Sequence, residues 1–80
     1  MNPRVKTVHP DPEYKLRLTF TDGDVRIFDM QPYLSIGVFQ ELRDVGLFNS
    51  VKPALGSVQW KNGQDLCPDT LYEDSIPIAP

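Results

Sequence analysis

The densest run of structural signals in this sequence is Trp60-Lys61-Asn62-Gly63-Gln64-Asp65-Leu66-Cys67-Pro68-Asp69-Thr70-Leu71-Tyr72. Asn62 and Gly63 lie between two runs that carry apolar residues, and both tolerate the positive φ that a two-residue type I′ turn requires. Pro68 suits the first turn of a helix, where the Asp69 carboxylate lies near the positive helix end. The stretch therefore predicts a strand, a turn, a second strand and a short helix.

Two carboxylates in this stretch are candidates for a functional role. A two-residue loop places Asp65 opposite Trp60, where the carboxylate can accept the indole N–H or cap the turn. Asp69 after Pro68 is interpreted as helix-start chemistry. Structural roles are the main interpretation, and a hard-metal site formed by Asp65, Asp69 and Glu73 is the alternative.

A second hairpin is predicted earlier in the chain, around Asp22-Gly23. Apolar and polar residues alternate over residues 14–21, which is typical of a strand buried on one face. With a two-residue loop, Phe20 pairs with Val25 and Leu18 pairs with Ile27, so that the apolar side chains share one face. The opposite face then carries Lys15, Arg17, Thr19, Arg26 and Phe28.

That opposite face has two interpretations. In the first it is a solvated sheet face, with a cation–π contact between Arg17 and Phe28 worth ~0.5–1 kcal/mol. In the second, Lys15, Arg17 and Arg26 form a docking surface for an acidic partner.

The remaining segments complete an α+β pattern. Residues 4–8 read as a strand that His9-Pro10-Asp11-Pro12 ends, because proline cannot donate to a ladder. Residues 38–43 have helical spacing, and Gly46 is expected to stop that helix. Pro53 indicates an edge strand and Leu55-Gly56 a tight return. We predict two three-stranded antiparallel meanders linked by a short helix, a short C-terminal helical turn, one domain over residues 1–74, and an extended proline-rich tail over residues 75–80.

Length, composition and charge limit the classes of function. The chain has 80 residues, one cysteine and a net charge of −3, and it lacks the run of ~20 apolar residues that a membrane span needs. The N-terminus has no signal-peptide pattern, so the cytoplasm is the expected compartment. Residues 41–80 carry the whole negative excess. An acidic chain without a basic stripe is a poor nucleic-acid binder, and a basic or mixed protein partner is expected instead.

Catalytic constellations are not evident in the sequence. His9 is the only imidazole, and a lone histidine at a strand corner is ordinarily a surface residue. Cys67 is expected to be a buried, inert thiol. Zinc patterns, phosphate-binding glycine loops and nucleotide fingerprints do not occur, so no cofactor is expected.

The pattern of residues is similar to that of a known protein family. The matching positions are Leu16-x-Leu18-x-Phe20-x-Asp22-Gly23, Phe28-Asp29, Phe39-x-x-Leu42, Phe48 and Trp60-x-Asn62-Gly63-x-Asp65-x-x-Pro68-Asp69-x-Leu71-Tyr72. They resemble a widespread bacterial family of small proteins described only as a domain of unknown function. The resemblance implies a cytoplasmic α+β domain, found alone or ahead of a helix-turn-helix segment, and often encoded beside a second small protein in a toxin–antitoxin-like arrangement.

These observations predict a non-enzymatic protein-binding or regulatory module that acts with a co-encoded small partner, with an antitoxin-like role. Its expected surfaces are the basic hairpin face, an open sheet edge and the acidic segment with Asp69, Glu73 and Asp74. Open edges at residues 4–8 and Pro53 predict a homodimer when the partner is absent. The alternative is a small-molecule or metal-binding domain using Trp60, Asp65, Asp69 and Tyr72.

Overall fold

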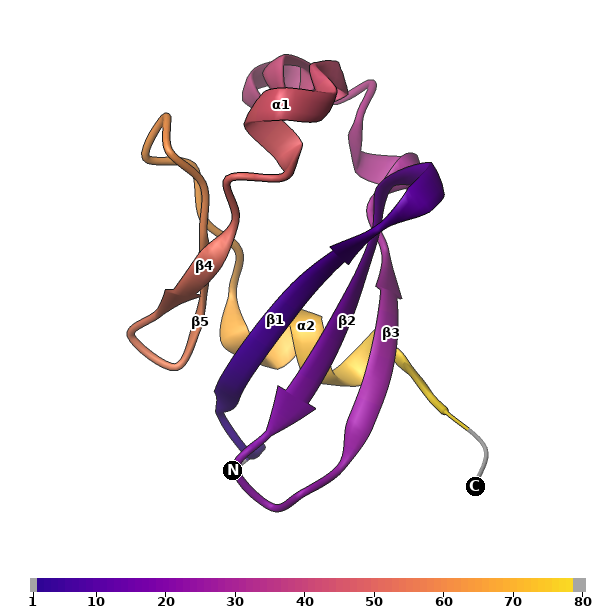
Figure 1. Ribbon diagram of the computed structural model, residues 1–80, viewed down its shortest axis with the longest axis vertical. Coiled ribbons are helices and arrows are strands. Elements are labelled where there is room, and N and C mark those ends of the chain that lie inside the picture. Colours follow the sequence, from indigo (N-terminus) through magenta and orange to yellow (C-terminus); the bar gives the residue numbers. More distant parts are fainter. Residues whose placement is uncertain (1, 79–80) are drawn as a thin grey trace.

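The computed structural model describes residues 2–78 and shows a mixed α+β fold (Figure 1). In chain order the elements are β1 (Val5–Asp11), the 3₁₀ helix η1 (Pro12–Tyr14), β2 (Lys15–Phe20), β3 (Val25–Asp29), the 3₁₀ helices η2 (Gln31–Tyr33) and η3 (Gly37–Arg43), α1 (Val45–Phe48), β4 (Lys52–Ala54), β5 (Ser57–Gln59), α2 (Pro68–Glu73) and β6 (Ile76–Pro77). The predicted mixture of helix and strand is confirmed, and the C-terminal helix begins at Pro68 as expected.

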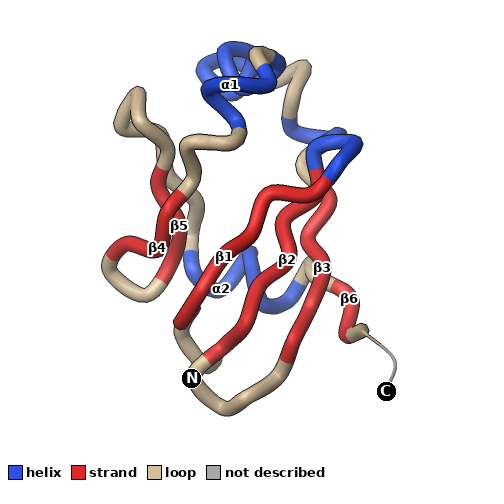
Figure 2. Tube along the Cα trace, viewed as in Figure 1, coloured by secondary structure: helices blue, strands red, loops and turns tan. Residues whose placement is uncertain are grey.

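The strands form two sheets, and the first predicted meander is present as β1-β2-β3, whereas the second predicted meander is not formed. The larger sheet is antiparallel in the order β1-β2-β3-β6, and the smaller one is the β4–β5 hairpin. Figures 1 and 2 show α2 behind the larger sheet and the β4–β5 hairpin beside β1. The expected third strand of the second meander is reduced to one bridge, between Gln59 and Asp65. The fourth strand of the larger sheet comes from the C-terminal segment, where β6 pairs with β3.

The first hairpin has a different register from the predicted one. Gly23 N–H donates to Phe20 O and Phe20 N–H donates to Asp24 O, both at 2.9 Å, so the loop contains three residues. Gly23 has φ +89°, as expected for the left-handed position that closes such a loop. Leu18 therefore pairs with Arg26. This shift of one residue turns Arg26 to the inner face of the sheet and Ile27 to the outer face.

The second hairpin repeats the same turn. Gly63 N–H donates to Trp60 O at 2.9 Å, Trp60 N–H donates to Gln64 O at 2.8 Å, and Gly63 has φ +90°. The predicted type I′ loop is therefore wrong here as well. Asp65 lies opposite Gln59 rather than Trp60, so the expected pairing of its carboxylate with the indole does not form.

The core lies between the inner face of the larger sheet and the helical segments. Trp60 fills its centre, and its Nε1–H donates to Phe48 O at 3.0 Å, which ties α1 to the end of β5. The buried apolar residues are Val5, Leu16, Leu18, Phe20, Phe28, Met30, Leu34, Leu42, Phe48, Val51, Val58, Trp60, Leu66 and Leu71. The motif residues Trp60 and Leu71 thus hold elements together from within.

β1 continues through Pro10 to Asp11, although that proline was expected to end it. Along β2 the backbone N–H and C=O groups of successive residues point alternately toward β3 and toward β1. Those of Phe20 point toward β3, where its N–H donates to Asp24 O, so those of Arg17, three residues earlier, point toward β1. Arg17 pairs with His9, so the nitrogen of Pro10 points away from β2. Its missing N–H removes no bond from this ladder, which is the position that proline tolerates in an edge strand.

The helical region between the sheets also departs from the prediction. Residues 37–43 form the 3₁₀ helix η3 rather than an α-helix of several turns. A new helix, α1, starts after Asp44, whose carboxylate accepts the Leu47 N–H at 3.1 Å. Gly46 lies inside α1, so it does not stop the helix as predicted.

Candidate functional site

The outer face of the larger sheet faces away from α2, and no other described element lies over it (Figure 1). Alternation along the strands decides which side chains it presents. They are Thr7, His9 and Asp11 from β1, Lys15, Arg17 and Thr19 from β2, Val25, Ile27 and Asp29 from β3, and Ile76 and Ile78 from the C-terminal segment. All of them are exposed or half-buried, whereas the inner face carries Leu16, Leu18, Phe20 and Phe28, which are buried.

Four aliphatic residues gather at one side of this outer face; we call Val25, Ile27, Ile76 and Ile78 the aliphatic strip. Ile76 pairs with Ile27, and Ile78 N–H donates to Val25 O at 3.0 Å, so the four side chains form two adjacent cross-strand rows. Ile76 is 70% exposed and Ile78 is 45% exposed. The sheet therefore presents a contiguous apolar surface to solvent.

The charged side chains of the outer face neutralise one another. The Arg17 Nη2 lies 3.1 Å from the Asp11 Oδ1, and His9 approaches the same oxygen at 3.5 Å. Lys15 lies across the ladder from Asp29, and its Nζ lies 3.9 Å from the Glu13 Oε2. Of the side chains expected to form a basic face, only those of Lys15 and Arg17 are on the outer side.

Arg26 lies on the inner face, where it holds the C-terminal segment. Its Nε donates to Ser75 Oγ at 2.7 Å, its Nη2 to Ser75 O at 2.8 Å, and its Nη1 to Asp24 Oδ2 at 3.0 Å. The guanidinium also lies 4.5 Å from the centroid of the Tyr72 ring. These contacts use the Arg26 guanidinium to position β6, and hence Ile76, beside β3.

Phe28 is a core residue rather than a partner for Arg17. It is 1% exposed and stacks on Tyr33 with ring centroids 5.6 Å apart. The Tyr33 hydroxyl donates to Asp74 Oδ2 at 3.2 Å. Burial raises the pKa of Tyr33 above its ordinary value of 10.0, and the Asp74 carboxylate adds to the effect through this hydrogen bond and its charge.

The acidic segment on and after α2 is exposed, and its side chains have partners within the chain. The Asn2 Nδ2 donates to Asp69 Oδ1 at 3.3 Å and to Glu73 Oε2 at 3.1 Å. Asp74 receives the Tyr33 hydroxyl. The segment therefore ties Asn2 to α2, and Tyr33 to the residue that follows α2.

The other motif residues have local contacts of their own. Asn62 Oδ1 accepts the Gln64 N–H, and Asp22 Oδ1 accepts the Asp24 N–H, both at 3.0 Å. Tyr72 packs edge-on against Phe20, with centroids 5.0 Å apart. Trp60, Asp65, Asp69 and Tyr72 thus each have separate neighbours. No group of three His, Cys, Asp or Glu residues that could hold a metal ion occurs among residues 2–78.

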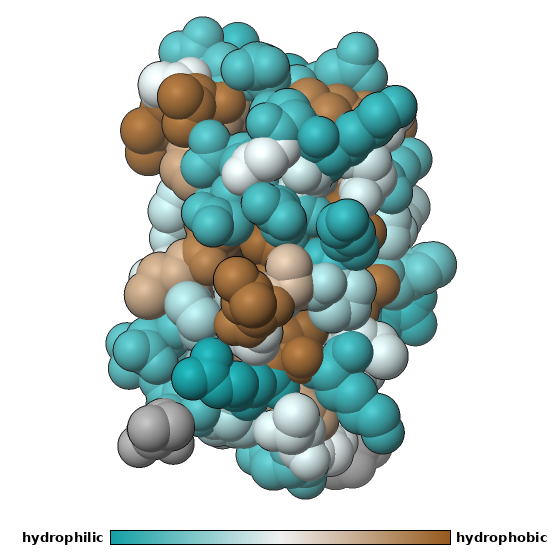
Figure 3. Space-filling model, turned by 90° about the vertical axis from the view of Figure 1, so that its left-hand side faces the viewer, coloured by the Kyte–Doolittle hydropathy of each residue, from teal (hydrophilic) through white to brown (hydrophobic). Residues whose placement is uncertain are grey.

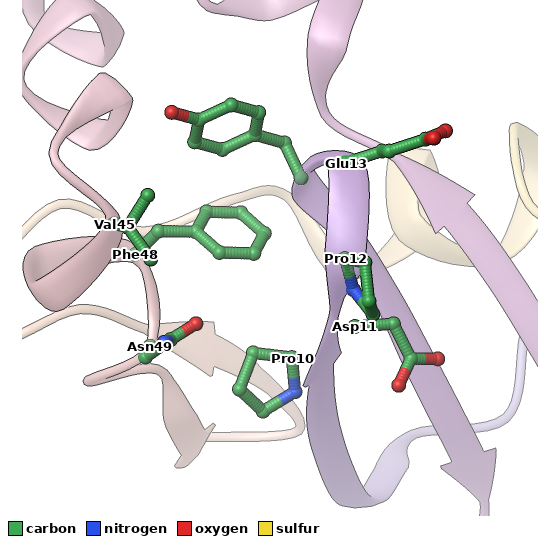
Figure 4. Close-up of a pocket in the computed structure, with 8 residues that line it drawn as sticks. Pro10, Asp11, Pro12, Glu13, Val45, Phe48 and Asn49 are labelled. Carbon is green, nitrogen blue, oxygen red and sulfur yellow. The ribbon is translucent and has the colours of Figure 1, made fainter.

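A pocket of about 330 Å³, which no sequence motif indicated, lies between the β1–β2 corner and α1. Glu13 and Tyr14 both have positive φ there, a conformation supported by hydrogen bonds from Met30 N–H to Tyr14 O and from Gln31 Nε2 to Glu13 O, each at 2.9 Å. Figure 4 shows Phe48 and Pro10 directed toward the hollow and the Glu13 carboxylate directed away from it. The pocket is thus mainly apolar.

Figure 3 shows hydrophobic patches among hydrophilic side chains on the side that carries the β4–β5 hairpin, where Leu55 is 96% exposed. His9 is exposed, as expected, but Cys67 is exposed too, so the prediction of a buried thiol is wrong. Within the described part of the chain, none of the helices has the length and apolar character to cross a membrane.

Comparison with known proteins identifies the family. The chain belongs to a protein family of unknown function, DUF2442, whose model matches residues 5–77. No curated protein and no solved structure matches the chain. The match includes both hairpins, the helical region and β6, in agreement with the resemblance seen in the sequence.

Proposed function

We propose that the chain is a non-enzymatic protein-binding module that docks a partner on the outer face of its larger sheet. The observation that carries the proposal is the aliphatic strip, which places four aliphatic side chains in two adjacent rows on an uncovered sheet face. Antiparallel sheets commonly present a polar face to water. An apolar patch in that place favours an interface with another macromolecule.

The chemistry around the strip favours a protein partner. Burying an exposed aliphatic side chain stabilises a complex by ~1.5–3 kcal/mol, and three isoleucines and a valine lie together here. The flanking charges are of both signs. This surface therefore suits a protein with an apolar patch of its own and a mixed polar rim, and it suits the phosphate backbone of a nucleic acid poorly.

The proposal extends to the biological setting that the family pattern implies. The partner is a small protein encoded beside this one, both act in the cytoplasm, and this chain is the neutralising, antitoxin-like member of the pair. Binding alone performs this role, so no catalytic step is assigned to His9 or Cys67. A Cys67→Ser variant is expected to bind the partner as the wild type does.

Co-purification tests the proposal. The tagged chain is co-expressed with the neighbouring gene product and washed at moderate salt, with Ile76→Glu and Ile27→Glu as strip variants and Leu55→Glu as control. Leu55 is a matched control because it is an exposed aliphatic residue away from the strip. We expect the wild type and the control to retain the partner and both strip variants to lose it. Retention by folded strip variants, or no retention by the wild type, would overturn the proposal.

A further inference from the structure

The outer face also fits a second copy of this chain. We infer that two copies pack strip against strip about a two-fold axis, so that self-association covers the surface assigned above to the partner. The inference goes beyond the proposed function because it concerns the purified chain alone. It follows from how the sheet edges are closed, from the charges of the face and from its area.

The two edges of the larger sheet are poorly suited to pairing with another sheet. Pro10 in β1 points its nitrogen away from β2, as described above. In β6, Ile78 N–H bonds Val25 on the β3 side, so alternation directs the nitrogen of Pro77 outward. Each edge therefore has a proline where a neighbouring strand needs a donor, which protects against edge-to-edge pairing.

The edge of the smaller sheet is protected in the same way. β4 and β5 are joined by Leu55-Gly56, both with positive φ, and Ala54 pairs with Ser57. In such a turn Ala54 and Ser57 share the closing hydrogen bond, so the next residue, Pro53, directs its nitrogen away from β5. Edge pairing at Pro53 or at residues 4–8, which the sequence suggested for a dimer, is thus less favourable than packing through a face.

The charges of the outer face are compatible with packing against the same face of a second copy. A two-fold interface brings the same patch from both copies together, and a patch of one sign would repel its copy. Here Arg17 is paired with Asp11 and Lys15 with Glu13, and Asp29 lies across the ladder from Lys15 on the same face. Each copy can place its cations near the carboxylates of the other while the isoleucines lose contact with water.

The size of the face sets the expected strength. Four strands spaced ~4.8 Å apart and about five residues with a rise of ~3.3 Å give a face of roughly 250 Å² in projection. A standard stable interface buries ~800 Å² on each partner. The dimer is therefore expected to be weak, with a dissociation constant between about 10 and 500 µM, so that a partner with a larger complementary surface displaces the second copy.

Sedimentation equilibrium of the purified chain from about 10 to 500 µM tests this inference. We expect the mass of the wild type and of Leu55→Asp to rise toward the dimer with concentration, at moderate and at high salt. Ile76→Asp and Ile27→Asp should stay monomeric, with circular dichroism confirming their fold. A monomeric wild type, or folded strip variants that associate like the wild type, would overturn it.

The result that would contradict self-association differs from the result that would contradict the proposed function. A monomeric wild type that still captures the co-encoded protein contradicts only the self-association. A dimer that captures no partner contradicts only the proposed function.

Discussion

The inner and outer faces of the larger sheet are formed by residues of the same strands, but the side chains of the inner face pack in the core and those of the outer face contact solvent. On the inner face, Phe28 is buried and even the charged Arg26 is held by Ser75 and Tyr72. On the outer face, Ile27 and Ile76 lie side by side in contact with solvent. The type of residue therefore does not reveal its role here. The register of β3 decides which side chains are structural and which are available for binding.

Removing an aromatic from the inner face should have the largest effect on stability. Phe28→Ala leaves a cavity under Tyr33 and is expected to lower the free energy of unfolding by ~3–5 kcal/mol. Ile27→Ala, one residue earlier but on the outer face, should lower it by less than about 1 kcal/mol. Urea denaturation monitored by Trp60 fluorescence compares the two variants. Equal losses would contradict the assignment of faces.

The turn that sets the register should be the next most sensitive point. Gly23→Val places a β-branched residue at φ +89°, which is expected to cost ~1–3 kcal/mol of stability. A Cβ atom at this position meets no atom within 4 Å, so the cost is expected to come mainly from the backbone conformation. Gly63→Val should behave alike because it has the same turn, whereas Gly23→Asn should remain closer to the wild type. Thermal unfolding of the three variants measures the difference.

Arg17 and Arg26, which the sequence pattern placed on one basic face, should differ in how much their removal lowers the free energy of unfolding. Arg26→Ala removes the hydrogen bonds to Ser75 and Asp24, and we expect a loss of ~1–2 kcal/mol together with faster proteolysis of the C-terminal segment. Arg17→Ala removes an exposed ion pair with Asp11, worth ~0–1 kcal/mol. Urea denaturation and limited proteolysis of both variants test this. A larger loss from Arg17→Ala would contradict the register.

The smallest expected effect is a pH dependence on the inner face, where Tyr33 covers Phe28. The pKa of Tyr33 is raised in the folded chain, so the folded state keeps the phenolic proton at pH values where the unfolded state loses it. Tyr33 thus contributes stability below the ordinary pKa of 10.0, and this contribution is lost as pH rises through the folded pKa. Unfolding curves measured below and above pH 10.0 should show that the free energy of unfolding falls at alkaline pH, and that this fall is smaller in Tyr33→Phe.

Much of the fold follows from local sequence, and the register does not. The alternation in β2 and the proline at the start of α2 predict their elements correctly, and Gly23 and Gly63 lie in turns at the predicted places, although each loop has three residues rather than two. Asp22-Gly23, however, suits a loop of two or three residues. The choice depends on burying Phe28 and on Ser75 accepting Arg26, a contact between residues 49 positions apart. No local pattern reports such a contact.

The candidate site was missed for a related reason. Half of the aliphatic strip comes from Ile76 and Ile78, in a segment whose prolines predicted an extended tail. A usable signal was present, because Ile76-Pro77-Ile78 and Val25-Arg26-Ile27 have the same alternation of aliphatic residues. Recognising it required knowing that Pro77 could face away from the neighbouring strand.

The most direct test of the outer face as the binding surface is a dilution series of ¹H–¹⁵N correlation spectra of the wild-type chain. Residues whose amide signals move with concentration mark the surface that the second copy covers. The account predicts shifts concentrated in β2, β3 and residues 76–78, with little change in β4, β5 and the turn at Leu55. Shifts confined to the β4–β5 hairpin or to β1 would contradict it, and spectra that do not change with concentration would contradict the self-association.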